Sequence, residues 1–394
     1  MYFRKIGQRS LKLLLVHFLF LGLLFAQERV LYEHDFNTQT TGLFLPVEID
    51  GKECKFLFDT GASFVVLDRS FRHLLSTPLT AKQVQARTGL NVGGDSIITP
   101  NGEIKLEMFK AVSLRLGRLQ VKNRYPYILA DLQSLWRFSG EKFCGILGTS
   151  FLHQFRWEID FDKGKVRAYF GDEPYMGSFT SRAPIFWSAA RIPQVHVAFQ
   201  GQNIVFDIDI GDNGSGRIIK QNVKYLKRAG LVTKTHKQKV VTVSSLSNSE
   251  EFRLKNFRFA NVLYPDIVMQ TSKQNAIGLA FFRRHNVVFD FPFNMLYLEH
   301  HQDYAAFQEL DKSGIRVILE DGKLIVFSMK HLKRAVVKGI RVGDEILTAN
   351  GKKISLFHMR KLLRQKRGTR IFLEMQRKDG VHKGSIVLGK DPLS

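Results

Sequence analysis

The sequence is poor in several features whose absence excludes whole classes of protein. Its 394 residues include only two cysteines, which excludes a small scaffold held together by several disulfides. With 10 prolines and 31 glycines, the chain is neither collagen-like nor low in complexity. It has no zinc-finger spacing, no RNP-like aromatic box and no long Lys/Arg block, so we expect no specific nucleic-acid partner.

Acidic residues are also scarce relative to basic ones. The chain carries 59 Lys and Arg against 36 Asp and Glu, a formal net charge of +23. Residues 305–394 hold 20 Lys and Arg and 9 Asp and Glu, which leaves a net charge of +11 in that segment. Such an excess attracts anions, so an acidic peptide or a membrane surface is a candidate partner. A solvated basic face without a dedicated ligand is the alternative.

Long apolar runs are confined to the N-terminus. A basic stretch at residues 4–12 precedes an apolar run at residues 13–26. As a helix this run spans about 21 Å, less than the ~30 Å hydrocarbon core of a membrane. The pattern predicts a signal peptide at residues 1–26 and a periplasmic or secreted protein, with an uncleaved N-terminal anchor as the alternative. Export would permit a disulfide between Cys54 and Cys144, which the sequence leaves open because geometry decides it.

An internal repeat organises the middle of the chain. Residues 46–63 align with residues 196–213, and residues 145–169 align without a gap with residues 275–299. In the first pair each segment turns at a glycine and reaches an Asp-x-Gly motif whose aspartate lies 8 residues later. Short alternating segments between Gly, Asn and Asp turns are typical of strands, so the predicted fold class is mainly β.

The repeat divides the chain into predicted domains. They are a first lobe at residues 30–170, a connector at 171–192, a second lobe at 193–300 and a C-terminal domain at 305–390. The connector contains two prolines and has no clear periodicity, as expected for a linking segment.

The strongest motif lies in the first lobe. Asp59-Thr60-Gly61-Ala62-Ser63 follows the apolar residues 56–58, and Ile146-Leu147-Gly148 lies far downstream. These motifs resemble those of the aspartic protease superfamily of pepsin and the retroviral proteases. Over residues 30–300 the resemblance implies two small retropepsin-like β lobes in one chain, each supplying one catalytic aspartate.

The implied catalytic pair is Asp59 and Asp209. Two carboxylates held close together cannot both ionise, so they share one proton. One then acts as general base on a water molecule, and the other donates a proton to the scissile carbonyl. Thr60 would form hydrogen bonds across the lobes, and Ser63 would orient Asp59. The supporting residues that the resemblance implies are Thr60, Gly61, Ser63, Gly148, Gly211 and Gly278.

The second lobe departs from the motif. It reads Asp209-Ile210-Gly211-Asp212-Asn213, so Ile210 has no hydroxyl and half of the cross-lobe network is missing. Three interpretations stay open. Asp209 is the second catalytic acid of an asymmetric site, or the second lobe is structural and the protein only binds peptides, or two first lobes pair in a homodimer.

Residues 88–107 occupy the interval in which the family has a flap, a β-hairpin that closes over the substrate. Gly89, Gly93 and Gly94 would supply its hinge mobility, and an ordinary surface loop is the alternative. We expect no metal and no cofactor, since the aspartates at residues 207–212 fail the calcium-loop pattern and the histidines at 300–301 lack a partner motif.

The C-terminal segment has a different character. It contains five strand-like stretches and one helix-like stretch at residues 355–366. A Gly-x3-Gly-Asp-x-Ile-Leu pattern at residues 339–347, followed by Asn-Gly, resembles a PDZ domain of the bacterial protease-associated type. The resemblance implies an α+β domain that binds a C-terminal peptide, with Ser313, Gly314 and Ile315 as the carboxylate-binding loop. A domain that only packs on the lobes is the alternative.

These features together predict an exported aspartic endopeptidase that hydrolyses peptide or protein substrates. A catalytically inactive, peptide-binding relative with the same architecture is the alternative function. The two functions differ in whether the carboxyl group of Asp209 lies beside that of Asp59 and takes part in catalysis.

Overall fold

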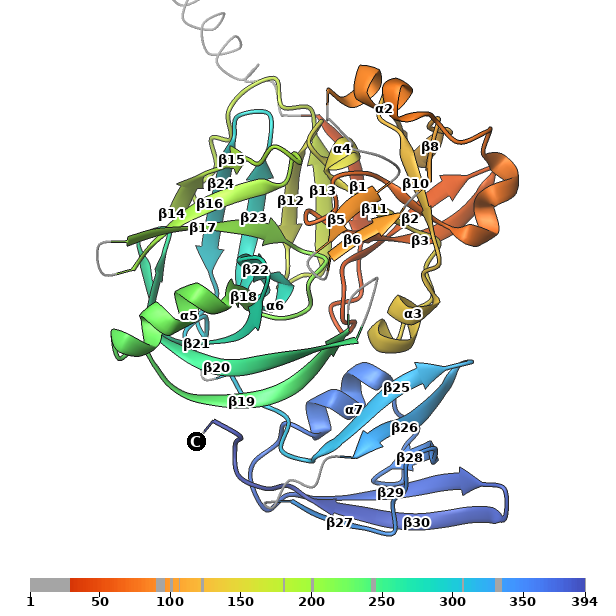
Figure 1. The fold of residues 1–394 in the computed structure, drawn as a ribbon, viewed down its shortest axis with the longest axis vertical. Helices are drawn as coiled ribbons and strands as arrows, with labels where there is room; N and C mark the ends of the chain where they lie inside the picture. The colour runs from red at the N-terminus through yellow and green to blue at the C-terminus, as the bar shows by residue number, and fades with distance from the viewer. Residues whose placement is uncertain are drawn as a thin grey trace, which may run out of the picture.

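The computed structural model describes residues 29–393 apart from 90–95, 100–101, 106, 122–123, 180, 200–201, 242–245, 307 and 330–334. Strands dominate the described chain, so the predicted mainly β class is confirmed (Figure 1). The predicted signal peptide and two predicted flap residues, Gly93 and Gly94, lie outside the described residues. Within the described ranges, none of the helices has both the length and the apolar character needed to cross a membrane.

The first sheet has eight strands and carries the Asp59 motif. In spatial order they are β7 (Met108–Phe109), β10 (Tyr127–Ala130), β4 (Val66–Asp68), β11 (Gly145–Leu147), β3 (Lys52–Phe58), β2 (Phe44–Ile49), β8 (Leu114–Leu116) and β9 (Leu119–Val121). The hairpin of β2 and β3 turns at Asp50 and Gly51, whose φ angles are 51° and 70°, as two-residue hairpin loops require. Phe56 and Phe58 on β3 are fully buried and help fix this strand in the core.

The second sheet also has eight strands and repeats the central part of the first. In spatial order they are β15 (Phe186–Trp187), β16 (Pro193–Phe199), β17 (Gln202–Asp209), β22 (Ala276–Gly278), β18 (Gly216–Ile219), β21 (Val262–Ser272), β20 (Leu246–Phe259) and β19 (Val232–Val241). The order β16-β17-β22-β18-β21 matches β2-β3-β11-β4-β10 of the first sheet. In both sheets the strand that leads to the aspartate pairs in parallel with a short strand that leads to the matched glycine.

A third sheet bridges the two. Its spatial order is β1 (Val30–Asp35), β13 (Lys165–Tyr169), β12 (Arg156–Asp160), β23 (His285–Asp290), β24 (Met295–His300) and β14 (Ser181–Pro184). At its centre Glu158 pairs with Val288, and these residues also occupy matched positions of the sequence repeat. The centre of the bridging sheet therefore relates the two halves by an approximate two-fold axis.

The first unit is built on the sheet that carries the Asp59 motif, and the second unit is built on the sheet that repeats it. Short helices complete the two units. They are the 3-10 helix η1 (Arg69–Leu74), α2 (Ala81–Thr88), α3 (Gln133–Ser139), α4 (Thr149–Leu152), α5 (Lys220–Arg228) and α6 (Leu279–Phe282). Helices α4 and α6 begin immediately after Gly148 and Gly278, so they too occupy matched positions of the repeat. A separate two-stranded hairpin is formed by β5 (Ser96–Thr99) and β6 (Gly102–Lys105).

The C-terminal residues form their own sheet and core, drawn in blue in Figure 1. The order is β25 (Ile315–Glu320), β26 (Lys323–Met329), β28 (Glu345–Ala349), β29 (Arg370–Arg377), β30 (Gly380–Val387) and β27 (Val336–Lys338). The helix expected at residues 355–366 is observed as α7 (Leu356–Leu362), capped by the Ser355 hydroxyl. The buried Met359 of this helix packs into the domain core. The short strand β27 is an element that the sequence pattern did not predict.

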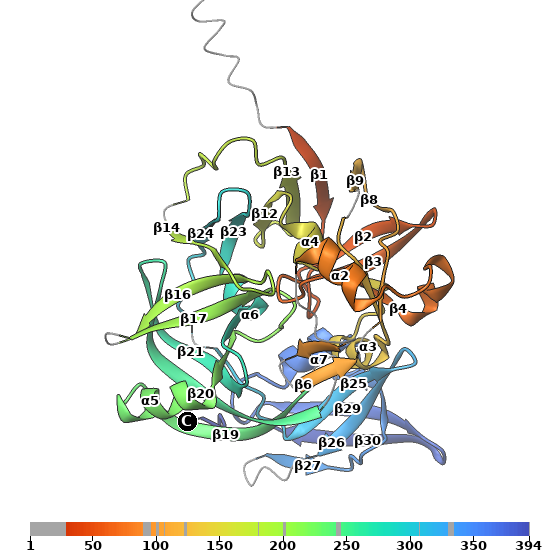
Figure 2. The same ribbon diagram turned by 45° about the horizontal axis from the view of Figure 1, so that its top comes forward.

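The C-terminal domain packs against the first unit through α3, which lies beside α7 and β25 in both views (Figures 1 and 2). Arg137 of α3 forms an ion pair of 2.6 Å with Glu320 of β25. The ring of Phe138 contacts that of Phe327 with 5.6 Å between centroids, and the Phe138 carbonyl accepts a hydrogen bond from Arg360 of α7.

The domain is also tied to the second unit. Arg253 of β20 pairs with Asp391 near the C-terminus at 2.6 Å. Ser215, in the loop before β18, donates a hydrogen bond of 2.8 Å to Gln308 in the linker that leads to the C-terminal domain. The C-terminal domain is therefore anchored to both halves of the preceding structure.

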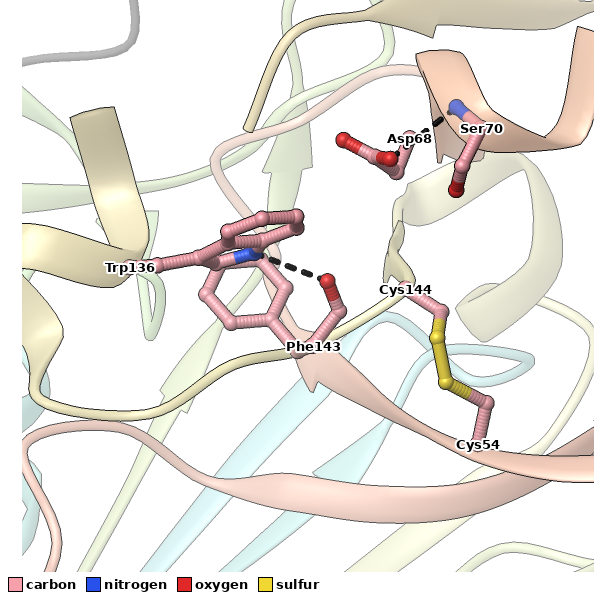
Figure 3. The surroundings of a disulfide bond; sticks show 6 residues. All are labelled: Cys54, Asp68, Ser70, Trp136, Phe143 and Cys144. Atoms are coloured by element: carbon pink, nitrogen blue, oxygen red, sulfur yellow. Dashed lines mark hydrogen bonds between the residues drawn. A yellow bond between two sulfur atoms is a disulfide. The ribbon is translucent and has the colours of Figure 1, made fainter. Parts of the chain in front are cut away.

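The two cysteines form a disulfide, which settles the pairing that the sequence left open (Figure 3). Cys54 lies on β3, and Cys144 directly precedes β11, the parallel neighbour of β3. Their Cα atoms are 6.0 Å apart, within the range that a disulfide spans. Beside the bond, the Trp136 indole donates a hydrogen bond to the Phe143 carbonyl at 2.8 Å.

Candidate active site

The position of Asp59 follows from the strand that precedes it. Asp59 comes directly after β3, and its backbone N–H donates to the Leu147 carbonyl of the parallel strand β11 at 3.1 Å. The chain then turns sharply, and the Gly61 N–H donates to Asp59 Oδ1 at 2.8 Å. The strand pairing and this turn aim the carboxyl group away from the sheet and toward the second unit.

Asp209 is placed in the same way in the second sheet. It is the last residue of β17 and pairs with Gly278 of the parallel strand β22. The Asp212 N–H donates to Asp209 Oδ1 at 3.0 Å, much as the Gly61 N–H does to Asp59. Neither aspartate is fully buried, which leaves part of each accessible to solvent.

The two carboxyl groups meet across the boundary between the units. A Cβ atom on Gly61 would lie 2.5 Å from Cγ of Asp209, and a Cβ on Gly211 would lie 2.5 Å from Oδ2 of Asp59. Each carboxyl therefore rests on the glycine that follows the other aspartate, where any side chain would collide with it. The two carboxyl groups are close enough to share a hydrogen bond. Asp209 thus fills the place that the Asp59 of a second copy would need in a homodimer.

Thr60 links the second unit to the first through its side chain. Its buried hydroxyl donates to the Ile208 carbonyl at 2.7 Å and accepts from the Ile210 N–H at 3.0 Å. Ile210 is fully buried but has no hydroxyl with which to form the reciprocal pair of bonds. The cross-unit network is therefore one-sided in the structure.

Gly148 and Gly278 allow the loops behind the two aspartates to pack closely. A Cβ on Gly148 would lie 2.7 Å from the Ala62 carbonyl oxygen, and one on Gly278 would lie 2.8 Å from that of Asp212. The Ser63 carbonyl accepts a hydrogen bond from the Ser150 N–H at 2.9 Å. Among the described residues the Ser63 hydroxyl forms no hydrogen bond with Asp59, so the orienting role given to Ser63 stays a prediction.

Arg217 is a site residue that the sequence pattern did not reveal. It lies on β18, and its guanidinium forms an ion pair with Asp209 through Nη2 and with Asp212 through Nε, the latter at 2.9 Å. Both its side chain and that of Asp209 are only 13% exposed. The structure thus places a nearly buried cation directly beside one of the two facing carboxyls.

Register explains why Arg217 was missed. Val66 pairs with Ile146 and Arg217 pairs with Ala276, and these two partners lie two residues before the matched glycines. Arg217 therefore occupies the position that the apolar Val66 occupies in the first sheet. The aligned sequence segment ended at residue 213, and one extra residue in the second loop shifts the register after it.

Burial and charge both act on the pair. Burial, together with the charge of Asp209, raises the pKa of Asp59 to about 8. Burial also raises the pKa of Asp209, but the Arg217 guanidinium opposes this effect. The pair titrates as a unit, and the two environments favour the proton on Asp59.

The predicted flap interval contains a hairpin, formed by β5 and β6. Gly89, which we expected to act as a hinge, ends α2 in the left-handed conformation with φ at 68°, and its N–H donates to the Gln85 carbonyl. The preceding Thr88 carbonyl accepts a hydrogen bond from Arg191 at 3.0 Å. Gly89 is thus a helix cap in this structure, and the hinge role of these glycines stays a prediction.

The loop expected to bind a carboxylate in the C-terminal domain is occupied by the chain itself. The N–H and the hydroxyl of Ser313 both donate to Asp311 Oδ1, at 2.8 and 2.6 Å. The Ile315 N–H donates to the Ser313 hydroxyl at 3.2 Å, and Gly314 has φ at 74°. In this arrangement Asp311 accepts hydrogen bonds from both the N–H and the hydroxyl of Ser313, and the carboxylate-binding role of the loop stays a prediction.

Comparison with known proteins gives one finding. No curated protein matches the chain. Residues 45–151 match the family model of an aspartyl protease. The matched segment runs from β2 to α4 and includes the Asp59 motif and Gly148, whereas Asp209 and Arg217 lie outside it. The match supports an aspartyl protease family for this chain, on the strength of its first sheet.

Proposed function

We propose that the chain is an aspartic endopeptidase whose catalytic dyad consists of Asp59 and Asp209. The observation that carries this proposal is the reciprocal contact of each carboxyl with the glycine after the other aspartate. Two related β units that each contribute one acid, and a family match over the first of them, support the same conclusion.

The chemistry follows from one shared proton. The ionised carboxyl removes a proton from a bound water, whose oxygen attacks the carbonyl carbon of the scissile peptide bond. The protonated carboxyl donates to the carbonyl oxygen, which gives a neutral tetrahedral intermediate. Collapse of this intermediate breaks the C–N bond as the amine takes up a proton. The hairpin of β5 and β6 is proposed to close over the bound peptide.

We further propose that the protein is exported, with residues 1–26 as its signal. The disulfide between Cys54 and Cys144 supports this location, because such bonds persist in oxidising compartments. The C-terminal domain is proposed to bind peptides as a PDZ-like module. Its edge strand β25 and helix α7 support that role, although α3 packs beside both of them in this structure.

The alternative function is an inactive peptide-binding relative. It is favoured by the ion pair between Arg217 and Asp209, because a carboxylate paired with a guanidinium is a weaker base. Under this alternative the site would bind peptides without cleaving them.

The test uses a diverse peptide library at pH values from acid to mildly alkaline, with the full chain as enzyme. Asp59→Asn and Asp209→Asn should each abolish cleavage while the thermal unfolding profile shows a folded protein. Asp35→Asn is the matched control, since Asp35 is 79% exposed and lies on β1. Full activity of Asp209→Asn would exclude the dyad. Peptide binding without cleavage by the wild type would establish the alternative.

A further inference from the structure

Two facing carboxyls with the same surroundings would share their proton evenly, but these two have different surroundings. The described charged groups that act on Asp209 are Arg217, Asp212, Asp207 and Asp59. Those that act on Asp59 are Asp209 and, more weakly, Arg217. At the position that matches Arg217, the first sheet has Val66, so Asp59 lacks an equivalent cation.

We propose that Arg217 is a positioning residue that makes the dyad asymmetric, holding Asp209 as the carboxylate that activates water and leaving the shared proton on Asp59. This inference rests on the proposed function and names the role of each acid within it. Its basis is the ion pair from Nη2 to Asp209, made by a side chain that is only 13% exposed.

Arg217 has a second acidic neighbour, Asp212. Nε lies 2.9 Å from Asp212 Oδ2, but the N–H does not point at that oxygen, so the contact is an ion pair rather than a hydrogen bond. Asp212 in turn donates its N–H to Asp209 Oδ1. Asp209 Oδ1 and Oδ2 are therefore each held by a different neighbour, and Asp212 balances the charge that Arg217 brings into the site.

The asymmetry assigns each proton transfer. Asp209 accepts a proton from water as the water oxygen bonds to the carbonyl carbon, while Asp59 donates its proton to the carbonyl oxygen. When the C–N bond breaks, the leaving nitrogen takes the proton from Asp209, and the hydroxyl of the intermediate returns its proton to Asp59. One water is consumed, and the dyad regains its starting protonation.

The pH–rate profile provides the first test. The one-proton state exists between the two apparent pKa values of the dyad, so these values bound the active range. An adjacent cation lowers a carboxyl pKa by about 1–3 units, so Arg217→Gln should move the acid limb of kcat/KM upward by about that amount. Arg217→Lys, which keeps the charge, should restore most of the shift. Arg253→Gln is the control for the loss of one positive charge, because Arg253 pairs instead with Asp266 and Asp391.

The second test does not depend on catalysis. Carbon-13 NMR titration of aspartate-labelled protein follows the side-chain carboxyl signals, with Asp59→Asn and Asp209→Asn used for assignment. We expect Asp209 to ionise at a lower pH than Asp59, and Arg217→Gln to narrow the gap between them. If the titrations gave these results but the wild type cleaved no peptide, the role of Arg217 would be upheld and the proposed protease activity would be rejected. An even titration that Arg217→Gln and Arg217→Lys both leave unchanged would overturn the inference, whatever the activity.

Discussion

Gly61→Ala tests the central geometry with one added methyl group. That methyl carbon would lie 2.5 Å from both Cγ and Oδ1 of Asp209 and 2.8 Å from Oδ2. Comfortable contacts between such atoms begin near 3.5 Å, so the two units must separate by about 1 Å or the carboxyl must rotate away. Either response moves the two carboxyls apart, and the shared proton depends on their proximity.

The expected effects differ in size for stability and activity. Overpacking of this kind costs about 1–3 kcal/mol, so a folded variant is expected. A misplacement of about 1 Å in a catalytic group can lower the rate by a factor of about 100. The assay compares kcat/KM on a peptide identified from the library with the urea midpoint of the same preparation.

A matched control lies in the corresponding loop of the second unit. Gly214→Ala adds the same methyl group near the site, but its nearest neighbour would be Asp212 Oδ1 at 3.3 Å. We expect this variant to keep activity within a few-fold of the wild type. If Gly61→Ala were as active as Gly214→Ala, the carboxyls would not be apposed in the active protein, and the dyad would have to be abandoned.

Three further outcomes are expected. Thr60→Val should lower the free energy of unfolding by about 2 kcal/mol or more, because it leaves two buried backbone groups without a partner, and Thr60→Ser should restore it in urea titrations. Since the pKa of Asp59 is raised to about 8, the folded state holds a proton that the unfolded state releases near pH 4, so stability should fall as the pH rises from about 4 to 8. Asp59→Asn should make the stability fall less steeply over this pH range. Equal slopes of unfolding free energy against pH for the wild type and Asp59→Asn would contradict the raised pKa of Asp59. Replacing Cys54 and Cys144 by serine should cost up to about 4–5 kcal/mol, since the bond joins residues 90 positions apart, and an unchanged urea midpoint would show that the bond does not form.

The sequence by itself predicted features that depend on local pattern. The mainly β class follows from short alternating segments and is observed, and the helix expected at residues 355–366 from apolar spacing is observed as α7 (Leu356–Leu362). The Asp59 motif and Gly148 led to the aspartic protease resemblance, which the family match over residues 45–151 supports. Such features are readable because a few neighbouring residues determine the backbone geometry on which they depend.

Other expectations stay predictions after the structure. The signal peptide and the glycines at residues 93–94 lie outside the described residues. Peptide binding by the C-terminal domain is likewise a proposal, and the structure adds that Asp311 already uses a donor of the expected loop. This contact joins residues only two positions apart, and an aspartate side chain commonly accepts a hydrogen bond from the backbone two residues on.

Only the tertiary structure decided the features that join distant segments. The disulfide became evident once β3 and β11 were placed side by side, and the apposition of Asp59 with Asp209 depends on how two separate sheets face each other. Arg217 is the clearest example, because one inserted residue obscured its equivalence to Val66 in the repeat. Electrostatic effects at a buried site depend on distances of a few ångströms between residues far apart in sequence. Those distances are fixed by strand register and packing, which the amino-acid pattern constrains only indirectly.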